Sequence, residues 1–250
     1  MAAAFVQKIT GQAAAVDSTT LVFGTNNTAG NFISVANFWY STDVTAHASG
    51  NITDSRNTYA LDVSGTAAST AHAGLWSALN IGAGANTVTV NPPGNDTYIS
   101  CVASEYSGVA TTSALDRTAS NSGNSTTPTS GTTATTTQAA ELVIACLSHN
   151  GSAATGIDLP SGYTNRYIQQ NNSTYQPGSA DELIVASTGA QSASWGTTAS
   201  NNWFGVIATY KAAAGGGAQV NARNGIALSG ITAINGIAKT GISAINGRTI

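Results

Sequence analysis

Short runs of strand-forming residues, separated by turn residues, recur along the first 210 positions and constrain the fold more than any other feature. The runs are rich in aromatic and β-branched residues, and a period of two dominates, most cleanly at residues 86–90. Helical periodicity is weak throughout. We therefore expect an all-β fold, namely a jelly-roll-like antiparallel β-sandwich with a short-strand C-terminal repeat tail. The clearest runs are residues 31–40, 86–90, 97–106, 141–147, 182–186 and 202–210.

Several weaker patterns add candidate strands. Residues 118–138 consist mostly of Thr, Ser, Gly, Asn and Ala. This composition favours a long surface loop, although the abundant Thr leaves an edge strand as the alternative. The weaker runs are Ala4–Ile9, Thr19–Phe23, Thr58–Val63, Ala73–Leu79, Tyr163–Gln169 and Ala193–Thr197.

Composition narrows the class of protein. Only 8% of the 250 residues are charged and 42% are hydrophobic, so Ser, Thr, Asn and Gly supply the polarity. Eight Lys and Arg residues and a net charge of −3 argue against a nucleic-acid-binding protein. No run of about 18 apolar residues is present, so we expect no membrane span. The N-terminus has no basic stretch followed by an apolar one, so we expect no secretory signal.

The composition changes after residue 210, and we divide the chain there. Residues 1–210 are predicted to form the sandwich, residues 211–218 an Ala/Gly-rich linker, and residues 219–250 a repeat tail. In the tail, Asn-Gly recurs every 11 residues. Asn-Gly between apolar residues is typical of a β-hairpin. Strands of three or four residues are not stable alone in water, so this tail needs a surface to pack on.

That surface is expected to belong to copies of the same chain or to another protein. Residues 1–210 carry eleven acidic and four basic residues, a net charge of −7, whereas the remainder carries four basic residues and no acidic one. Complementary charge would orient such a tail on an acidic surface. We expect the tail isoleucines to make the anchoring contacts: Ile226, Ile231, Ile234, Ile237, Ile242 and Ile245.

The sequence contains no motif for catalysis or for a metal site: Gly-x-Ser-x-Gly, His-x-His and Cys-x-x-Cys are all missing. His47 and His72 have no partner nearby in the sequence, so we expect both at the surface or rim. Glu105 is expected to face outward or to bond a neighbouring loop. We predict no enzymatic activity and no cofactor. Calcium stays open, because it takes oxygen ligands from dispersed loops such as those with Asp54, Asp62, Asp96, Asp116 and Asp158.

Cysteine and tryptophan give limited information. Cys101 and Cys146 lie in apolar runs and are expected to be core residues, with a disulfide as the alternative. Trp39 and Trp203 also lie in apolar runs and are predicted to be buried. Trp195 has polar neighbours, so we name it as a candidate contact for a glycan.

Residues 53–60, 105–110, 114–120, 162–166 and 203–211 together resemble a sandwich domain seen in bacterial surface proteins and in phage virion proteins. The resemblance covers residues 5–212. It departs at Arg56, where a small residue or Gly is more usual, so that turn is expected to differ. The tail, with Ile234-Asn-Gly-Ile, resembles the short repeats that end many phage structural proteins.

The resemblance implies an architecture and transfers no catalytic residues. Together with the tail, it implies a non-enzymatic structural component of a phage virion: a capsid decoration protein, a head fibre or a tail protein. Its partners would be other virion proteins, copies of itself and host-surface glycans, and assembly would take place in the host cytoplasm. The alternative is a secreted bacterial adhesin or carbohydrate-binding module, found outside the cell. A hydrolase ranks last.

Overall fold

The computed structural model describes most of the chain. The described residues are 2–42, 47–67, 70–94, 97–150, 156–170, 174–214, 233–234, 237–238, 244–245 and 248–249. The chain divides into two compact units, Met1–Ala213 and Ala214–Ile250. We call them the body and the C-terminal unit and describe each by itself.

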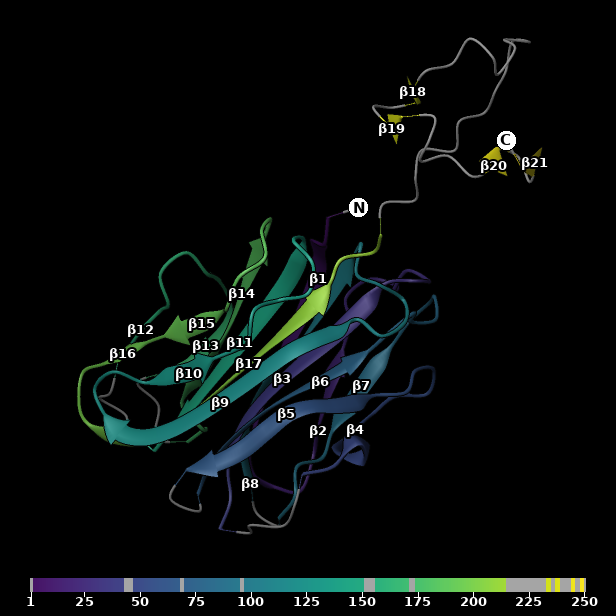
Figure 1. Ribbon diagram of the computed structural model, residues 1–250. Coiled ribbons are helices and arrows are strands. Elements are labelled where there is room, and N and C mark those ends of the chain that lie inside the picture. Colours follow the sequence, from purple (N-terminus) through teal and green to yellow (C-terminus); the bar gives the residue numbers. More distant parts are fainter. Residues whose placement is uncertain are drawn as a thin grey trace. The chain divides into compact units, whose positions relative to one another are not determined.

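Two five-stranded antiparallel sheets face each other and form the body (Figure 1). The first sheet has the order β1 (Ala4–Val16), β8 (Thr97–Ser107), β3 (Phe32–Tyr40), β6 (Ala71–Ala78) and β5 (Ala60–Ala67). The second has the order β13 (Thr164–Gln169), β14 (Gly178–Val185), β11 (Glu141–His149), β17 (Asn201–Lys211) and β9 (Leu115–Ser125). Apolar side chains of both sheets meet in one central core cluster.

Short strands add a second apolar layer outside each sheet. A three-stranded sheet covers the outer face of the first sheet and packs against it in an outer core cluster. Its order is β2 (Thr19–Val22), β7 (Thr87–Val90) and β4 (Ile52–Thr53). A short 3-10 helix, Ser49–Asn51, precedes β4. Two pairs lie over the second sheet: β10 (Thr129–Thr132) with β15 (Ser192–Ser194), and β12 (Ile157–Asp158) with β16 (Gly196–Thr197). The body therefore contains three core clusters, one between the sheets and one outside each of them.

The central strands are consequently buried on both faces. In β3, Phe32 and Phe38 belong to the core between the sheets, whereas Val35 and Trp39 belong to the outer cluster. All nine residues of β11 are buried. Burial of apolar surface stabilises by about 25 cal/mol per Å². Strands buried on two faces read as continuous hydrophobic runs rather than as clean alternation, which is the pattern of residues 31–40 and 141–147.

The two halves of the body share one strand pattern. The first sheet, β1-β8-β3-β6-β5, corresponds strand by strand to β9-β17-β11-β14-β13, which is the second sheet named from its other edge. The covering strands follow the same rule. In the order β2-β7-β4, β2 corresponds to β10, β7 corresponds to β15 and β16 together, and β4 corresponds to β12. Trp195 alone separates β15 from β16.

Register irregularities occur at matching points of the two halves. On the first sheet they fall at Val6 of β1 and Asp62 of β5, and one more, between Ala13 and Val16 of β1, has no counterpart. On the second sheet they fall at Asp116 of β9 and Arg166 of β13. All four residues lie on edge strands, and three of them are charged. Bulges and charges on an edge discourage pairing with another chain. The body is therefore two copies of one pattern packed face to face.

The predicted all-β antiparallel sandwich is confirmed. The jelly-roll part of that prediction is not, because each sheet is built from one half of the chain rather than by Greek keys spanning both sheets. The loop predicted for residues 118–138 is wrong, since β9 and β10 occupy much of it and β9 is the edge strand that was the alternative. The predicted linker also begins too early. Lys211 ends β17, and Ala212 forms a bridge with Val109.

In the C-terminal unit, two hairpins follow each other at the repeat distance. β18 (Ala233–Ile234) pairs with β19 (Ile237–Ala238), and β20 (Ala244–Ile245) pairs with β21 (Arg248–Thr249). Each flanks an Asn-Gly dipeptide, as the sequence predicted for these two turns. Ile226, Ile231 and Ile242 lie outside the described residues, as do the three Asn-Gly dipeptides themselves. Within the described part of the chain, no helix is long and apolar enough to cross a membrane.

Candidate functional site

The repeated pattern separates residues that the fold requires from residues that only one half carries. Tyr106 and Tyr210 stand at equivalent places in β8 and β17, and both are fully buried in the central core. A residue type that occurs in both halves serves the fold. Residues that differ between the halves are numerous, and they include the charged and partly exposed side chains where β1 and β13, the edges of the two sheets, lie next to each other.

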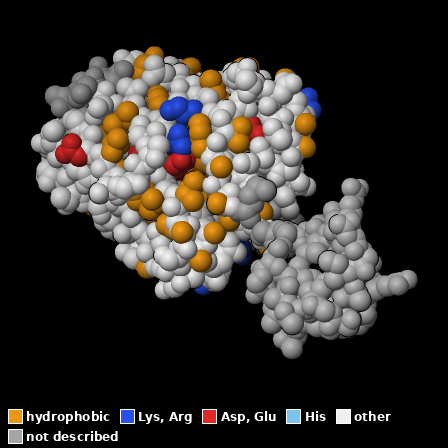
Figure 2. Space-filling view, turned by 90° about the horizontal axis from the view of Figure 1, so that it is seen from above, with side chains coloured by type: hydrophobic (Ala, Val, Ile, Leu, Met, Phe, Trp, Pro, Cys, Tyr) orange, Lys and Arg blue, Asp and Glu red, His pale blue; other side chains and the backbone are white. Residues whose placement is uncertain are grey.

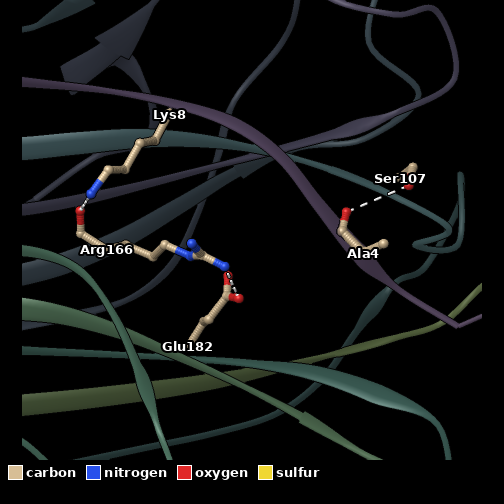
Figure 3. Close-up of polar contacts among 5 residues, drawn as sticks. All are labelled: Ala4, Lys8, Ser107, Arg166 and Glu182. Atoms are coloured by element: carbon tan, nitrogen blue, oxygen red, sulfur yellow. Dashed lines mark hydrogen bonds and ion pairs between the residues drawn. The ribbon is translucent and has the colours of Figure 1, made fainter.

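The first part of this β1–β13 edge is ionic (Figure 3). Arg166 pairs with Glu182, and its guanidinium carbon lies 3.6 Å from the centre of the Phe5 ring. Lys8 donates a hydrogen bond to the carbonyl oxygen of Arg166 and so ties β1 to β13. Burial and the nearby Arg166 charge lower the pKa of Lys8. Burial opposes the charge on Arg166, but Glu182 outweighs it and raises the pKa of Arg166.

The opposite edge holds a different set at the equivalent points. Asp62 stands where Arg166 stands in the other half, and Ser77 stands where Glu182 does. The hydroxyl groups of Tyr210 and Ser77 donate to the Asp62 carboxylate, at 2.7 and 3.1 Å. Burial raises the pKa of Asp62 to about 6. Each half thus places a polar bulge residue beside the buried tyrosine of the other half.

The second part of the β1–β13 edge is aromatic and uncharged. Tyr40 of β3 pairs with Tyr98 of β8, and their ring centroids are 5.9 Å apart. Tyr167 of β13 stacks on Phe38 with centroids 5.6 Å apart. Its hydroxyl group donates to the side-chain oxygen of Gln12, at 3.3 Å. Apart from the fully buried Phe38, these side chains keep part of their surface in solvent.

A small cavity adjoins the ionic part of the edge at Arg166. Its polar lining includes Ser34, Ser104, Tyr106, Arg166 and Asp181. The cavity volume is about 10 Å³, which is close to the least that holds one water molecule. It has no room for a substrate. On the face shown in Figure 2, charged side chains are few and lie among apolar and neutral polar ones, in line with the composition of the chain.

Trp195, the predicted glycan contact, is only 3% exposed, so that prediction is wrong. The residue covers the outer face of the second sheet, and its indole N–H donates to the Asp181 carboxylate at 2.9 Å. Its polar neighbours in the sequence belong to short covering strands. Trp39 and Trp203 are buried, as predicted.

The prediction for His72 is also wrong, because this side chain is 1% exposed. It stacks on Trp39, with ring centroids 4.9 Å apart, and its Nδ1 lies 2.8 Å from the Thr66 hydroxyl. His47 is partly buried, and its Nε2 lies 3.3 Å from Nδ1 of His72. Burial and the neighbouring His72 lower the pKa of His47 to about 4. Tertiary contacts thus bring together two histidines that lie 25 positions apart.

The loop aspartates mostly bond to nearby groups of the chain. Asp54 accepts the backbone N–H of Arg56 at 2.7 Å, whereas the Arg56 guanidinium donates to the carbonyl oxygens of Ala83 and Ala85. Asp116 accepts two bonds from Thr137. Asp96 lies outside the described residues. Among the residues that the structure does describe, no three His, Cys, Asp or Glu side chains converge as metal ligands.

Both cysteines are buried and free, which confirms the prediction of core residues. Burial raises the pKa of the Cys101 thiol to about 12. A thiol with such a pKa stays protonated at neutral pH and is a poor nucleophile.

Glu141 provides a test of how buried acids affect the body. The residue is fully buried at the start of β11, and burial together with the neighbouring Asp116 raises its pKa to about 7. A raised pKa stabilises the body below about pH 4.5, and this contribution is lost as the pH rises through 7. Glu141→Gln is therefore expected to raise the melting temperature at pH 8 by about 3 °C and to flatten its pH dependence between 4.5 and 7. An unchanged pH profile, measured by thermal unfolding, would contradict this.

No family model, curated protein or solved structure matches this chain. Its site is therefore interpreted from its own residues. Sequence reasoning identified neither the aromatic nor the ionic part of the β1–β13 edge. The one available signal was that Tyr40 and Tyr98 close or open predicted strands, where side chains emerge from the core.

Proposed function

We propose that this protein is a non-enzymatic structural component of a phage virion, either a capsid decoration or head-fibre protein or a tail protein. The body is displayed, and the C-terminal unit anchors it or joins copies of it. The observation that carries this proposal is the C-terminal unit itself, a compact unit in which two hairpins recur one repeat apart.

The hairpins are too short to stand alone. Each has two-residue strands, and hairpins of this size are only marginally stable in water. Repeat units become stable when neighbouring repeats bury a common face, and terminal repeats carry polar residues as caps. Arg223 and Arg248 take the place of isoleucine in the first and last Asn-Gly units. This pattern supports a short array of hairpins that ends in polar residues and binds neighbouring chains, rather than an array to which further repeats could be added without limit.

Removal of residues 219–250 is expected to leave the body folded and to abolish attachment or oligomer formation. Ile234→Asp with Ile237→Asp is expected to do the same, because a buried isoleucine contributes roughly 1.5–3 kcal/mol and a buried carboxylate is unfavourable. The melting temperature reports on the body, and light scattering or co-sedimentation with particles reports on attachment.

A matched control places the same charge at polar positions of the repeat. Ser229→Asp with Thr240→Asp is expected to keep attachment. High salt is expected to slow attachment more than it weakens the finished contact, because ions screen charges beyond about 8 Å at physiological ionic strength. If the truncated chain unfolds, or if it still attaches, the C-terminal unit does not have this role.

Virion localisation is tested on assembled particles. Antibodies against the body are expected to label purified particles at regular positions in electron micrographs. Secretion of the protein by bacterial cells that hold no phage genes would favour the adhesin or carbohydrate-binding alternative instead.

A further inference from the structure

We propose that the aromatic part of the β1–β13 edge is a binding site for neutral oligosaccharides. Tyr40, Tyr98 and Tyr167 would provide the apolar faces, and Gln12 and Gln169 the hydrogen bonds. This inference goes beyond the structural function proposed above and does not depend on it, because the residues concerned all belong to the body.

The geometry of the tyrosine pair is the first argument. Tyr40 and Tyr98 lie opposite each other at the end of the β3–β8 pairing, and their rings meet edge to face at an interplanar angle of 76°. Both side chains are partly exposed. No described residue is hydrogen-bonded to either phenol oxygen. Two rigid amphipathic rings whose hydroxyl groups bond to no described residue are well suited to contact a ligand.

The neighbouring residues extend this surface. Phe38 is two residues before Tyr40 on the same face of β3, and Tyr167 stacks on it with an interplanar angle of 29°. The Tyr167 hydroxyl group lies 3.3 Å from the side-chain oxygens of both Gln12 and Gln169. The result is two aromatic pairs, Tyr40 with Tyr98 and Tyr167 with Phe38, with two amide groups beside the Tyr167 hydroxyl. We refer to these residues together as the row.

The other half of the body shows that the fold does not require this row. Asn150 and Asn202 stand where Tyr40 and Tyr98 stand, and the Asn150 N–H donates to the Asn202 carbonyl oxygen at 2.9 Å. Val63 stands at the place of Tyr167 in the same register. The same strand pattern therefore forms with amides and a valine, so it does not depend on these tyrosines.

The chemistry of the row fits neutral sugars. The C–H face of a pyranose ring packs on an aromatic ring, and its hydroxyl groups both donate to and accept from side-chain amides and phenols. None of the side chains that form the row is charged. The charged residues of the edge, Lys8, Arg166 and Glu182, bond to one another or to the backbone. An acidic ligand would have no free cation within the row.

The experiment is native affinity electrophoresis of the full chain in gels that contain dextran, xylan, mixed-linkage β-glucan or galactomannan. Retardation by at least one polymer is expected, and titration calorimetry with the matching oligosaccharide then gives the affinity. Tyr40→Asn with Tyr98→Asn copies the equivalent residues of the other half. This variant is expected to bind about tenfold more weakly or worse, with an unchanged melting temperature.

The controls make each outcome decisive. Asn150→Ala with Asn202→Ala alters the equivalent place on the other half and is expected to leave retardation unchanged. If the double tyrosine variant does not fold, Gln12→Ala, at an exposed position, and Tyr98→Asn alone serve in its place. The proposal is overturned if no polymer of the panel retards the wild-type chain. It is also overturned if retardation survives in the folded tyrosine variants and in Gln12→Ala.

Discussion

Glu105→Ala is expected to lower the free energy of unfolding of the body by about 4 kcal/mol, since several buried donors lose their acceptor at once. The Glu105 carboxylate is fully buried in β8. It accepts hydrogen bonds from Gln7 at 2.6 Å, Asn27 at 2.7 Å and Asn31 at 2.7 Å, and from the Thr28 backbone N–H at 2.9 Å. One side chain thereby fastens edge strand β1 and the loop before β3.

Glu105→Gln separates charge from shape. Burial alone would raise the pKa of Glu105, but the four donors outweigh burial and hold this pKa below its ordinary value of 4.5. A lowered pKa stabilises the folded state above about pH 4.5, and the contribution is lost as the pH falls through the folded value. The wild-type chain should therefore exceed Glu105→Gln in unfolding free energy at pH 7, and this difference should shrink in acid.

Chemical denaturation at a series of pH values measures both effects. A loss below about 1 kcal/mol for Glu105→Ala would mean that water replaces the carboxylate at little cost. Glu105 was expected to face outward or to bond a neighbouring loop, and the second of these outcomes is confirmed.

The strand pattern was predictable because hydrophobic periodicity is a local property. The predictions failed where contacts with residues distant in the sequence determine the structure. Residues 118–138 contain few apolar side chains, yet β9 pairs with β17 at ten positions because backbone hydrogen bonds need no particular side chain. His72 became a core residue because it stacks on Trp39 of the neighbouring strand and lies against His47, 25 positions away in the sequence. No local pattern contains that information.

The repeated strand pattern was not predictable from the sequence, because its two copies share few side chains. Trp39 corresponds to His149, and Phe38 to Ser148, in register. The two halves resemble each other in strand order and in bulge positions, which are properties of the strand pairing rather than of the side chains. The same divergence hid the aromatic edge. Tyr40 and Tyr98 look like ordinary strand residues until the other half shows asparagines at their places.

Arg166→Asp tests this equivalence of the halves and is expected to destabilise the body by about 3 kcal/mol or more. It removes the cation that pairs with Glu182 and that lies over the Phe5 ring, and it places a second carboxylate beside the first. The two partners are only 18% and 6% exposed, and breaking a buried pair leaves an uncompensated charge.

Adding Glu182→Ser to Arg166→Asp is expected to recover more than half of that loss. The double variant reproduces the arrangement of the other half, in which Asp62 accepts from Ser77 and from the buried Tyr210. Tyr106 lines the same small cavity as Arg166, which places it to serve as the equivalent donor. Urea denaturation of the wild-type, single and double variants measures the recovery as a coupling energy. If the double variant is no more stable than Arg166→Asp alone, the two bulge sites are alike in backbone only. If the double variant recovers stability, the two bulge sites are equivalent in their side chains as well as in their backbone. The pair Arg166–Glu182 can then be replaced by the arrangement that Asp62 and Ser77 form in the other half.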